Sequence, residues 1–166
     1  MDSPAELRDS LKTAEKEHIH VVTWADRDYP RPLRTIPDPP AFLFYRGSLD
    51  AVSTNPSVAV IGSRRCSIYG RRAASAIASA LAGAGACVVS GLARGIDGEA
   101  HRGALAAGGL TAAVFAGGLD LIYPPEHRGL ARSILKRGCL LSEYPPGLKP
   151  ARYTFPERNR IISGLC

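Results

Sequence analysis

The sequence lacks most of the short motifs that identify a catalytic or cofactor site. It contains no G-x-x-x-x-G-K-[ST] phosphate loop, no G-x-S-x-G nucleophile elbow and no H-E-x-x-H zinc-binding pair. The first apolar run is not followed by G-x-G-x-x-G, and the second ends in Ser90 and Gly91 rather than in an acidic residue that would bind a ribose hydroxyl. These absences argue against NAD binding, and we expect no cofactor.

Cysteine is also scarce. The four cysteines show no C-x-x-C or other metal-ligand spacing, and Cys87 and Cys139 lie inside apolar runs. We therefore expect buried, reduced thiols of a cytosolic protein and no metal site. Residues 73–93 carry no formal charge but are mostly Ala, Gly and Ser, so we expect no membrane span there. The polar N-terminal stretch MDSPAELRDS does not have the order of a signal peptide.

Acidic residues are few in one part of the chain. Residues 127–160 contain eight Lys or Arg and only two Asp or Glu, whereas the rest of the 166 residues has equal numbers of both signs. This segment therefore accounts for the formal net charge of +6. A basic region on an otherwise neutral body indicates a polyanionic partner such as nucleic acid or a nucleotide phosphate. A solvated basic surface explains the charge equally well.

Apolar runs that end in small-residue turns are abundant. Four of them are SVAVIGSR, ACVVSGLARG, TAAVFAGGLD and CLLSEYPPG. The glycines that close the first three, Gly62, Gly91 and Gly117, are 29 and 26 residues apart. Segments suited to helices lie between and after them, at about 70–83, 97–107 and 126–137. Strands and helices alternating at this spacing predict right-handed βαβ units, and hence an α/β fold with a doubly wound, mostly parallel, Rossmann-like sheet.

The first third of the chain differs from this pattern. Residues 1–19 begin with a polar, charged stretch that is expected to be helical. VVTW at 21–24 and FLFYRG at 42–47 are typical of short strands, and the proline-rich segment between them is typical of turns and extended chain. We therefore divide the chain into a helical and extended lead-in segment, residues 1–56, and a Rossmann-like domain, residues 57–166.

The turns after the strands carry the candidate binding residues. In an open parallel sheet, the carboxyl ends of the strands share one rim, where ligands bind. Gly62, Ser63 and Arg64 directly follow the first strand of the domain. Glycine amides, a hydroxyl group and a guanidinium all suit a phosphate. The alternative is an ordinary tight turn with a solvated arginine.

The second turn contains a candidate acid-base pair. Its polar and glycine residues are Ser90, Gly91, Arg94 and Gly95, followed by Asp97 and His101. Asp97 is a candidate helix N-cap, and it stands four residues from His101, a spacing at which a carboxylate and an imidazole on one helical face can interact. The alternative is a capping aspartate with a histidine bonded to a neighbouring loop. No further residue completes a recognisable triad or metal site.

The last segment, FPERNRIISGLC, places arginines at the start of a helix. Thr154 and Glu157 match the capping box S/T-x-x-E, which predicts a helix N-terminus there. Around it lie Arg152, Phe155, Arg158, Asn159 and Arg160. Cations at this end of a helix are unfavourable unless an anion binds among them. Phosphate binding with an aromatic ring for stacking predicts single-stranded nucleic acid, and arginines paired with carboxylates are the alternative. Tyr123 and Tyr144 lie in loops of the same rim and are suited either to stack on bases or to pack the loops.

Five segments, in this order, resemble the DNA-processing protein A family (DprA, also called Smf): VIGSR, VVSGLARGIDGEAH, GGLDLIYPPEH, LLSEYPPG and FPERNRIISGL. The resemblance extends over about residues 19–166 and includes YPRPLRTIPDPPAFLFYRG, which is similar to the family's lead-in to its nucleotide-binding-type fold. It implies a bacterial cytosolic protein that binds single-stranded DNA, protects it during natural transformation and helps to load RecA onto it. It implies no chemical reaction on DNA.

The resemblance also assigns roles to residues. It implies that DNA is bound by Gly62, Ser63, Arg64, Arg152, Phe155, Arg158, Asn159 and Arg160. It implies that the pocket is shaped, without catalysis, by Ser90, Gly91, Arg94, Gly95, Asp97 and His101. At Arg152 family members can carry Lys, and Arg would serve the same phosphate.

Family members continue past this segment with more strands, regions for self-association as a homodimer and often a small C-terminal domain. The resemblance therefore implies a sheet that is incomplete at its C-terminal end. We expect an unpaired strand edge and a last helix whose apolar stripe, Ile161, Ile162 and Leu165, is partly uncovered. Such a helix would anchor Arg158 poorly, and the chain would be less stable than one extended through further strands.

Two other hypotheses stay open at this point. Related doubly wound folds act on nucleoside monophosphates, and such an enzyme would use Asp97, His101 or Glu143 as acid or base. The absence of an evident carboxylate pair and the cationic loops favour binding over catalysis. The remaining hypothesis is a purely structural remnant of a truncated gene.

Overall fold

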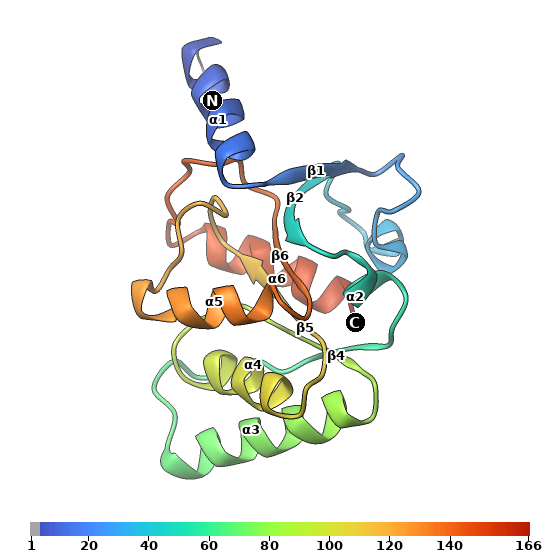
Figure 1. The fold of residues 1–166 in the computed structure, drawn as a ribbon, viewed down its shortest axis with the longest axis vertical. Coiled ribbons are helices and arrows are strands. Elements are labelled where there is room, and N and C mark those ends of the chain that lie inside the picture. Colours follow the sequence, from blue (N-terminus) through green and yellow to red (C-terminus); the bar gives the residue numbers. More distant parts are fainter. Residues whose placement is uncertain (1–3) are drawn as a thin grey trace.

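A mixed six-stranded sheet organises the protein, whose computed structural model describes residues 4–166 (Figure 1). The strand order is β1-β2-β6-β5-β4-β3. The parallel strands are β3 (Ser57–Ala59), β4 (Cys87–Ser90), β5 (Thr111–Phe115) and β6 (Cys139–Ser142). The antiparallel strands are β1 (His20–Thr23) and β2 (Phe42–Gly47), and β2 pairs with β6. The mostly parallel α/β sheet predicted from the sequence is therefore confirmed.

Helices cover both faces of this sheet (Figure 1). The crossovers between neighbouring parallel strands are α3 (Ile68–Gly83), α4 (Ile96–Ala106) and α5 (Arg128–Ile134), the last preceded by a 3-10 turn, η2 (Pro125–His127). The other face is covered by η1 (Arg31–Thr35), α2 (Asp50–Ser53) and α6 (Thr154–Gly164). The first helix, α1 (Pro4–Lys16), extends away from the sheet.

The apolar strands alternate between these two layers. Val88 packs with buried alanines of α3 and α4, and Leu140 packs with α5. Their neighbours Val89 and Leu141 belong to the cluster on the opposite face, which includes Ile161 of α6. Because both faces are buried, every residue of these strands must be apolar or hydrogen-bonded, which explains the continuous apolar runs.

The predicted helices and strands are largely confirmed. The segments 70–83 and 97–107 correspond to α3 and α4. The segment 126–137 is shorter in the structure, because a 3-10 turn precedes α5 and the helix ends at Ile134. The expected N-terminal helix is α1, and residues 1–3 lie outside the described residues. The strands of the expected lead-in segment, β1 and β2, continue the sheet beyond β6.

The expectation that the apolar stripe of the last helix is partly uncovered is wrong. Ile161, Ile162 and Leu165 are at most 2% exposed. The lead-in segment covers them, because Leu33 and Ile36 pack so closely on α6 that a Cβ at Gly164 would lie 2.9 and 2.8 Å from their side chains. Among the described residues, β3 forms one edge of the sheet, and continuation of the sheet by further strands stays a prediction.

The two cysteines in apolar runs are buried and free, as predicted. Cys87 and Cys139 are both 0% exposed. Burial raises the pKa of the Cys87 thiol to about 12 and raises the pKa of Cys139 as well, so both thiols are protonated at neutral pH. Within residues 4–166, none of the helices combines the length and the apolar character that crossing a membrane requires.

Candidate nucleic-acid interface

A cleft of about 210 Å³ lies at the carboxyl ends of the parallel strands. Its walls come from the loops after β3 and β4, from the first turn of α4 and from the N-terminal half of α6. The lining residues are Ile61, Gly62, Arg64, Ala93, Asp97, Phe155, Arg158, Asn159 and Ile162. Segments about 90 residues apart in the sequence thus form one site, and five of the residues implied to bind DNA are brought together there.

The outer part of the cleft is cationic and aromatic. Arg64 is exposed, and its guanidinium carbon lies 4.4 Å from the centre of the Phe155 ring. The Tyr123 ring lies 6.4 Å from the same ring at an angle of 60°. Arg64 forms no ion pair with any described residue. A cation held on an aromatic face, with its charge unpaired, is suited to a phosphate beside a stacked base.

Two loops are fixed against each other at this site. Gly95 has a φ of +76°, and a Cβ there would lie 2.2 Å from the carbonyl oxygen of Ser63. Ile96 N donates to the same carbonyl oxygen over 3.2 Å. Ser90 is buried, and its hydroxyl donates to Val60 O over 2.7 Å. Only glycine permits this approach of the β4 loop to the β3 loop.

The bottom of the cleft holds a buried pair of opposite charges. Asp97, 5% exposed, accepts hydrogen bonds from Gly62 N (3.3 Å) and Gly91 N (3.2 Å). Arg158, 4% exposed, donates to Gly91 O over 3.0 Å and to Val114 O. Burial raises the pKa of Asp97 and lowers the pKa of Arg158, and each charge opposes the shift of the other. Arg158 is therefore well anchored, contrary to the sequence-based expectation.

Both predicted helix caps are wrong. Thr154 begins α6, but its hydroxyl donates to Ala151 O and accepts from Ala151 N, which lies before the helix. The Glu157 carboxylate accepts from the Tyr144 hydroxyl over 2.7 Å, and the backbone N–H of Thr154 donates to Ala151 O over 3.2 Å instead of to Glu157. Asp97 lies inside the first turn of α4, where Gly95 is the N-cap residue, and its carboxylate is bonded across the cleft.

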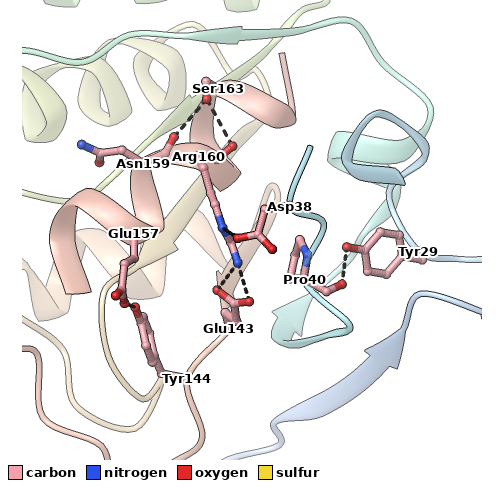
Figure 2. Close-up of polar contacts among 9 residues, drawn as sticks. All are labelled: Tyr29, Asp38, Pro40, Glu143, Tyr144, Glu157, Asn159, Arg160 and Ser163. Carbon is pink, nitrogen blue, oxygen red and sulfur yellow. Dashed lines mark hydrogen bonds and ion pairs between the residues drawn. The ribbon is translucent and has the colours of Figure 1, made fainter. Parts of the chain in front are cut away.

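Arg160 lies outside this cleft and is paired with carboxylates. Figure 2 shows its guanidinium between Asp38 and Glu143. Nε donates to Asp38 over 2.9 Å, and Nη2 donates to both Glu143 oxygens over 2.6 and 2.8 Å. The structure of Arg160 therefore matches the alternative hypothesis, in which an arginine of this helix pairs with carboxylates. Asp38 is 122 residues away in sequence, and no local pattern could have predicted the contact.

The remaining residues of the predicted set surround the cleft. Arg152 is exposed and does not line it. Ser63 is exposed, and its hydroxyl accepts from Arg65 N over 3.1 Å. Arg94 forms an exposed ion pair of 2.5 Å with Glu126. Arg94 and Tyr123 line a smaller adjoining pocket together with Phe155, so Phe155 stands between the two hollows.

Asp97 and His101 do not form the acid-base pair. His101 is fully buried, and its Nδ1 lies 2.7 Å from the Thr111 hydroxyl, which donates to Val88 O. Because the Thr111 hydroxyl proton is donated to Val88 O, His101 Nδ1–H is the donor in the contact with Thr111. Burial lowers the pKa of His101 to about 3. With Glu143 bonded to Arg160, all three candidate acid or base groups have structural partners, and the described residues contain no metal-binding cluster of three His, Cys, Asp or Glu.

A Rossmann-like fold with a cationic and aromatic cleft at the carboxyl ends of its strands defines a class of nucleotide- and nucleic-acid-binding proteins. The family model of DNA recombination-mediator protein A matches residues 20–166. The chain belongs to this family, as the five sequence segments predicted.

Curated and solved relatives agree with this assignment. The chain is 46% identical over 158 residues to protein Smf of Synechocystis and 46% identical over 166 residues to DNA processing protein DprA of Streptococcus pneumoniae. The X-ray structure of the S. pneumoniae protein superposes with a TM-score of 0.85 at 42% identity, over 95% of this chain and 55% of that one. A Helicobacter pylori structure, described for the single-stranded DNA binding mode of DNA processing protein A, superposes with a TM-score of 0.78 at 32% identity, over 89% and 66%.

The chain spans only part of these relatives. The match with the Synechocystis protein includes 93% of this chain but only 40% of that protein. The match with the S. pneumoniae protein includes 100% of this chain and 58% of that protein. The activities of the relatives as whole proteins therefore cannot be assigned to these 166 residues directly.

Proposed function

We propose that this chain binds single-stranded DNA in the cleft at the carboxyl ends of its strands, as part of a cytoplasmic protein that protects incoming DNA during natural transformation. The observation that carries the proposal is Arg64, an exposed cation that has no ion pair within residues 4–166 and is stacked on Phe155 beside the exposed Asn159. Phosphate contacts from Arg64 and stacking on Phe155 bind a strand without reading its bases. The single-stranded DNA binding described for the H. pylori relative supports the same function.

Binding rather than turnover is the activity we assign to the cleft. The acid and base candidates Asp97, His101 and Glu143 are each bonded within the protein. RecA as a partner and homodimer formation are further proposals, and they rest on the family resemblance and not on a surface of this chain.

Arg64→Ala is expected to weaken binding of oligo-dT by about 1–3 kcal/mol, because one charge-assisted hydrogen bond to phosphate is lost. The dissociation constant is measured by fluorescence anisotropy on the full chain at fixed salt. Arg132→Ala is the matched control, since Arg132 is an exposed arginine on α5, outside the cleft lining. Equal effects of the two substitutions would reject the cleft as the binding site.

A further inference from the structure

The backbone amides at the bottom of the cleft are already bonded to a carboxylate of the chain itself. In doubly wound folds the amides of the strand-to-helix turns are the groups that bind a ligand phosphate. Here Gly62 N and Gly91 N, which follow β3 and β4, donate to the two oxygens of Asp97 over 3.3 and 3.2 Å. Asp97 is only 5% exposed, so a ligand phosphate can reach these amides only by displacing its carboxylate.

Arg158 is a buried cation near this carboxylate, and its charge opposes the rise in the pKa of Asp97 that burial causes. Its guanidinium donates to Gly91 O and Val114 O and lies so close to Gly91 that a Cβ there would be 2.4 Å from Nη1. Arg158 is bonded to backbone carbonyls and forms no ion pair with Asp97, so the carboxylate is the charged group that is bonded to the two amides. Farther out lies Arg64, an exposed cation without an ion pair in the part of the chain that the structure describes.

We propose that Asp97 is a built-in substitute for a ligand phosphate, and that it makes the cleft select phosphodiesters over terminal phosphates. This inference rests on the proposed function and adds its specificity. A ligand phosphate is held by the outer groups Arg64, Ser63 and Asn159, and a diester brings a single negative charge to them. A phosphate monoester carries nearly two negative charges above pH 7. The second charge is repelled by the Asp97 carboxylate, and no free backbone amide is left to stabilise it. The internal linkages of a strand therefore bind better than free nucleotides or strand ends.

A purely structural role of Asp97 makes a different prediction. If the carboxylate only ties the loops after β3 and β4 together, its loss weakens every ligand in the same proportion. If it substitutes for a phosphate, its loss changes the ratio of two affinities. The comparison therefore needs two ligands that differ in charge and otherwise by no more than one small group.

Thymidine 5′-phosphate and its methyl ester are such a pair. Each competes with labelled oligo-dT for the full chain at pH 8, and the methyl ester is expected to bind at least about fivefold more tightly, because like charges repel in the cleft. Asp97→Asn is expected to bring the two affinities within about twofold of each other. Asp120→Asn is the control and should keep the wild-type ratio, since Asp120 also accepts a backbone N–H, from Gly147 over 2.9 Å, but lies outside the cleft lining.

Wild-type protein supplies a second test that does not depend on how the variant folds. Below about pH 6 the monoester loses its second charge, so at pH 5.5 it should approach the affinity of the methyl ester. Arginine side chains keep their charge over this range, and a proton taken up by Asp97, whose pKa is raised by burial, acts in the same direction as protonation of the monoester. Equal or tighter binding of the monoester at pH 8, an unchanged ratio in folded Asp97→Asn, or no competition by either nucleotide would overturn the inference. Failure of oligo-dT itself to bind would instead reject the proposed function.

Discussion

Arg158→Ala is expected to lower the free energy of unfolding by about 3–5 kcal/mol, through the fold and not only through a lost DNA contact. The substitution leaves the Asp97 carboxylate buried without a counter-charge, and it removes the donor of Gly91 O and Val114 O. Breaking a buried pair by removing one partner is costly because the other charge stays out of water. Urea denaturation followed by circular dichroism measures the change.

Arg152→Ala is the matched control for this prediction. Arg152 precedes the same helix, but it is exposed and has no ion pair with any described residue, so its removal should change stability by less than about 0.5 kcal/mol. A double variant, Arg158→Ala with Asp97→Asn, should recover part of the loss, since it leaves no unpaired buried charge. Equal stability of Arg158→Ala and wild type would show that the buried pair is not needed for folding.

Lowering the pH from 7.5 to 5 is expected to cost the fold about 2 kcal/mol through His101 alone. The folded-state pKa of His101 is lowered to about 3, from the ordinary value of 6.5, so the unfolded chain binds a proton that the folded chain does not. The stability that His101 contributes is thus complete above pH 6.5 and is lost progressively as the pH falls toward about 3. Each pH unit in this window corresponds to about 1.4 kcal/mol.

His101→Gln tests this assignment, because glutamine can still donate to the Thr111 hydroxyl and does not titrate. Unfolding free energies from urea titrations at pH 7.5 and pH 5 should differ less in this variant than in the wild type. His20→Gln, at an exposed histidine of β1, should retain the wild-type pH dependence. The same pH dependence in all three proteins would exclude His101 as the source.

The sheet could be predicted from the sequence because each parallel strand is recognisable by its own apolar run. Val88 and Val89 face opposite layers, so burial on both sides is visible as an unbroken apolar run. The cleft was predictable for a similar reason, since the fold class alone requires the turns at Gly62 and Gly91 to share one rim. Phe155 and Asn159 of α6 line the same cleft, and their binding of DNA stays a prediction.

The contacts of the individual arginines could not be predicted. Arg158 and Arg160 are two residues apart and looked alike in sequence, yet one is buried on backbone carbonyls and the other pairs with Asp38 and Glu143. These partners come from distant parts of the chain, and their positions depend on tertiary packing that no local pattern encodes. The same holds for Asp97, whose partners Gly62 and Gly91 are brought together by the βα turns.

We expect single-stranded DNA to bind through its phosphates in the Arg64 cleft. The most direct measurement is the affinity of the full chain for oligo-dT, and for a duplex of equal length, over a series of salt concentrations. The single strand should bind more tightly than the duplex, and log affinity should fall linearly with log salt, with a slope of about −0.7 for each phosphate contacted. Equal affinity for the single strand and the duplex, or an affinity that does not change with salt, would contradict this expectation.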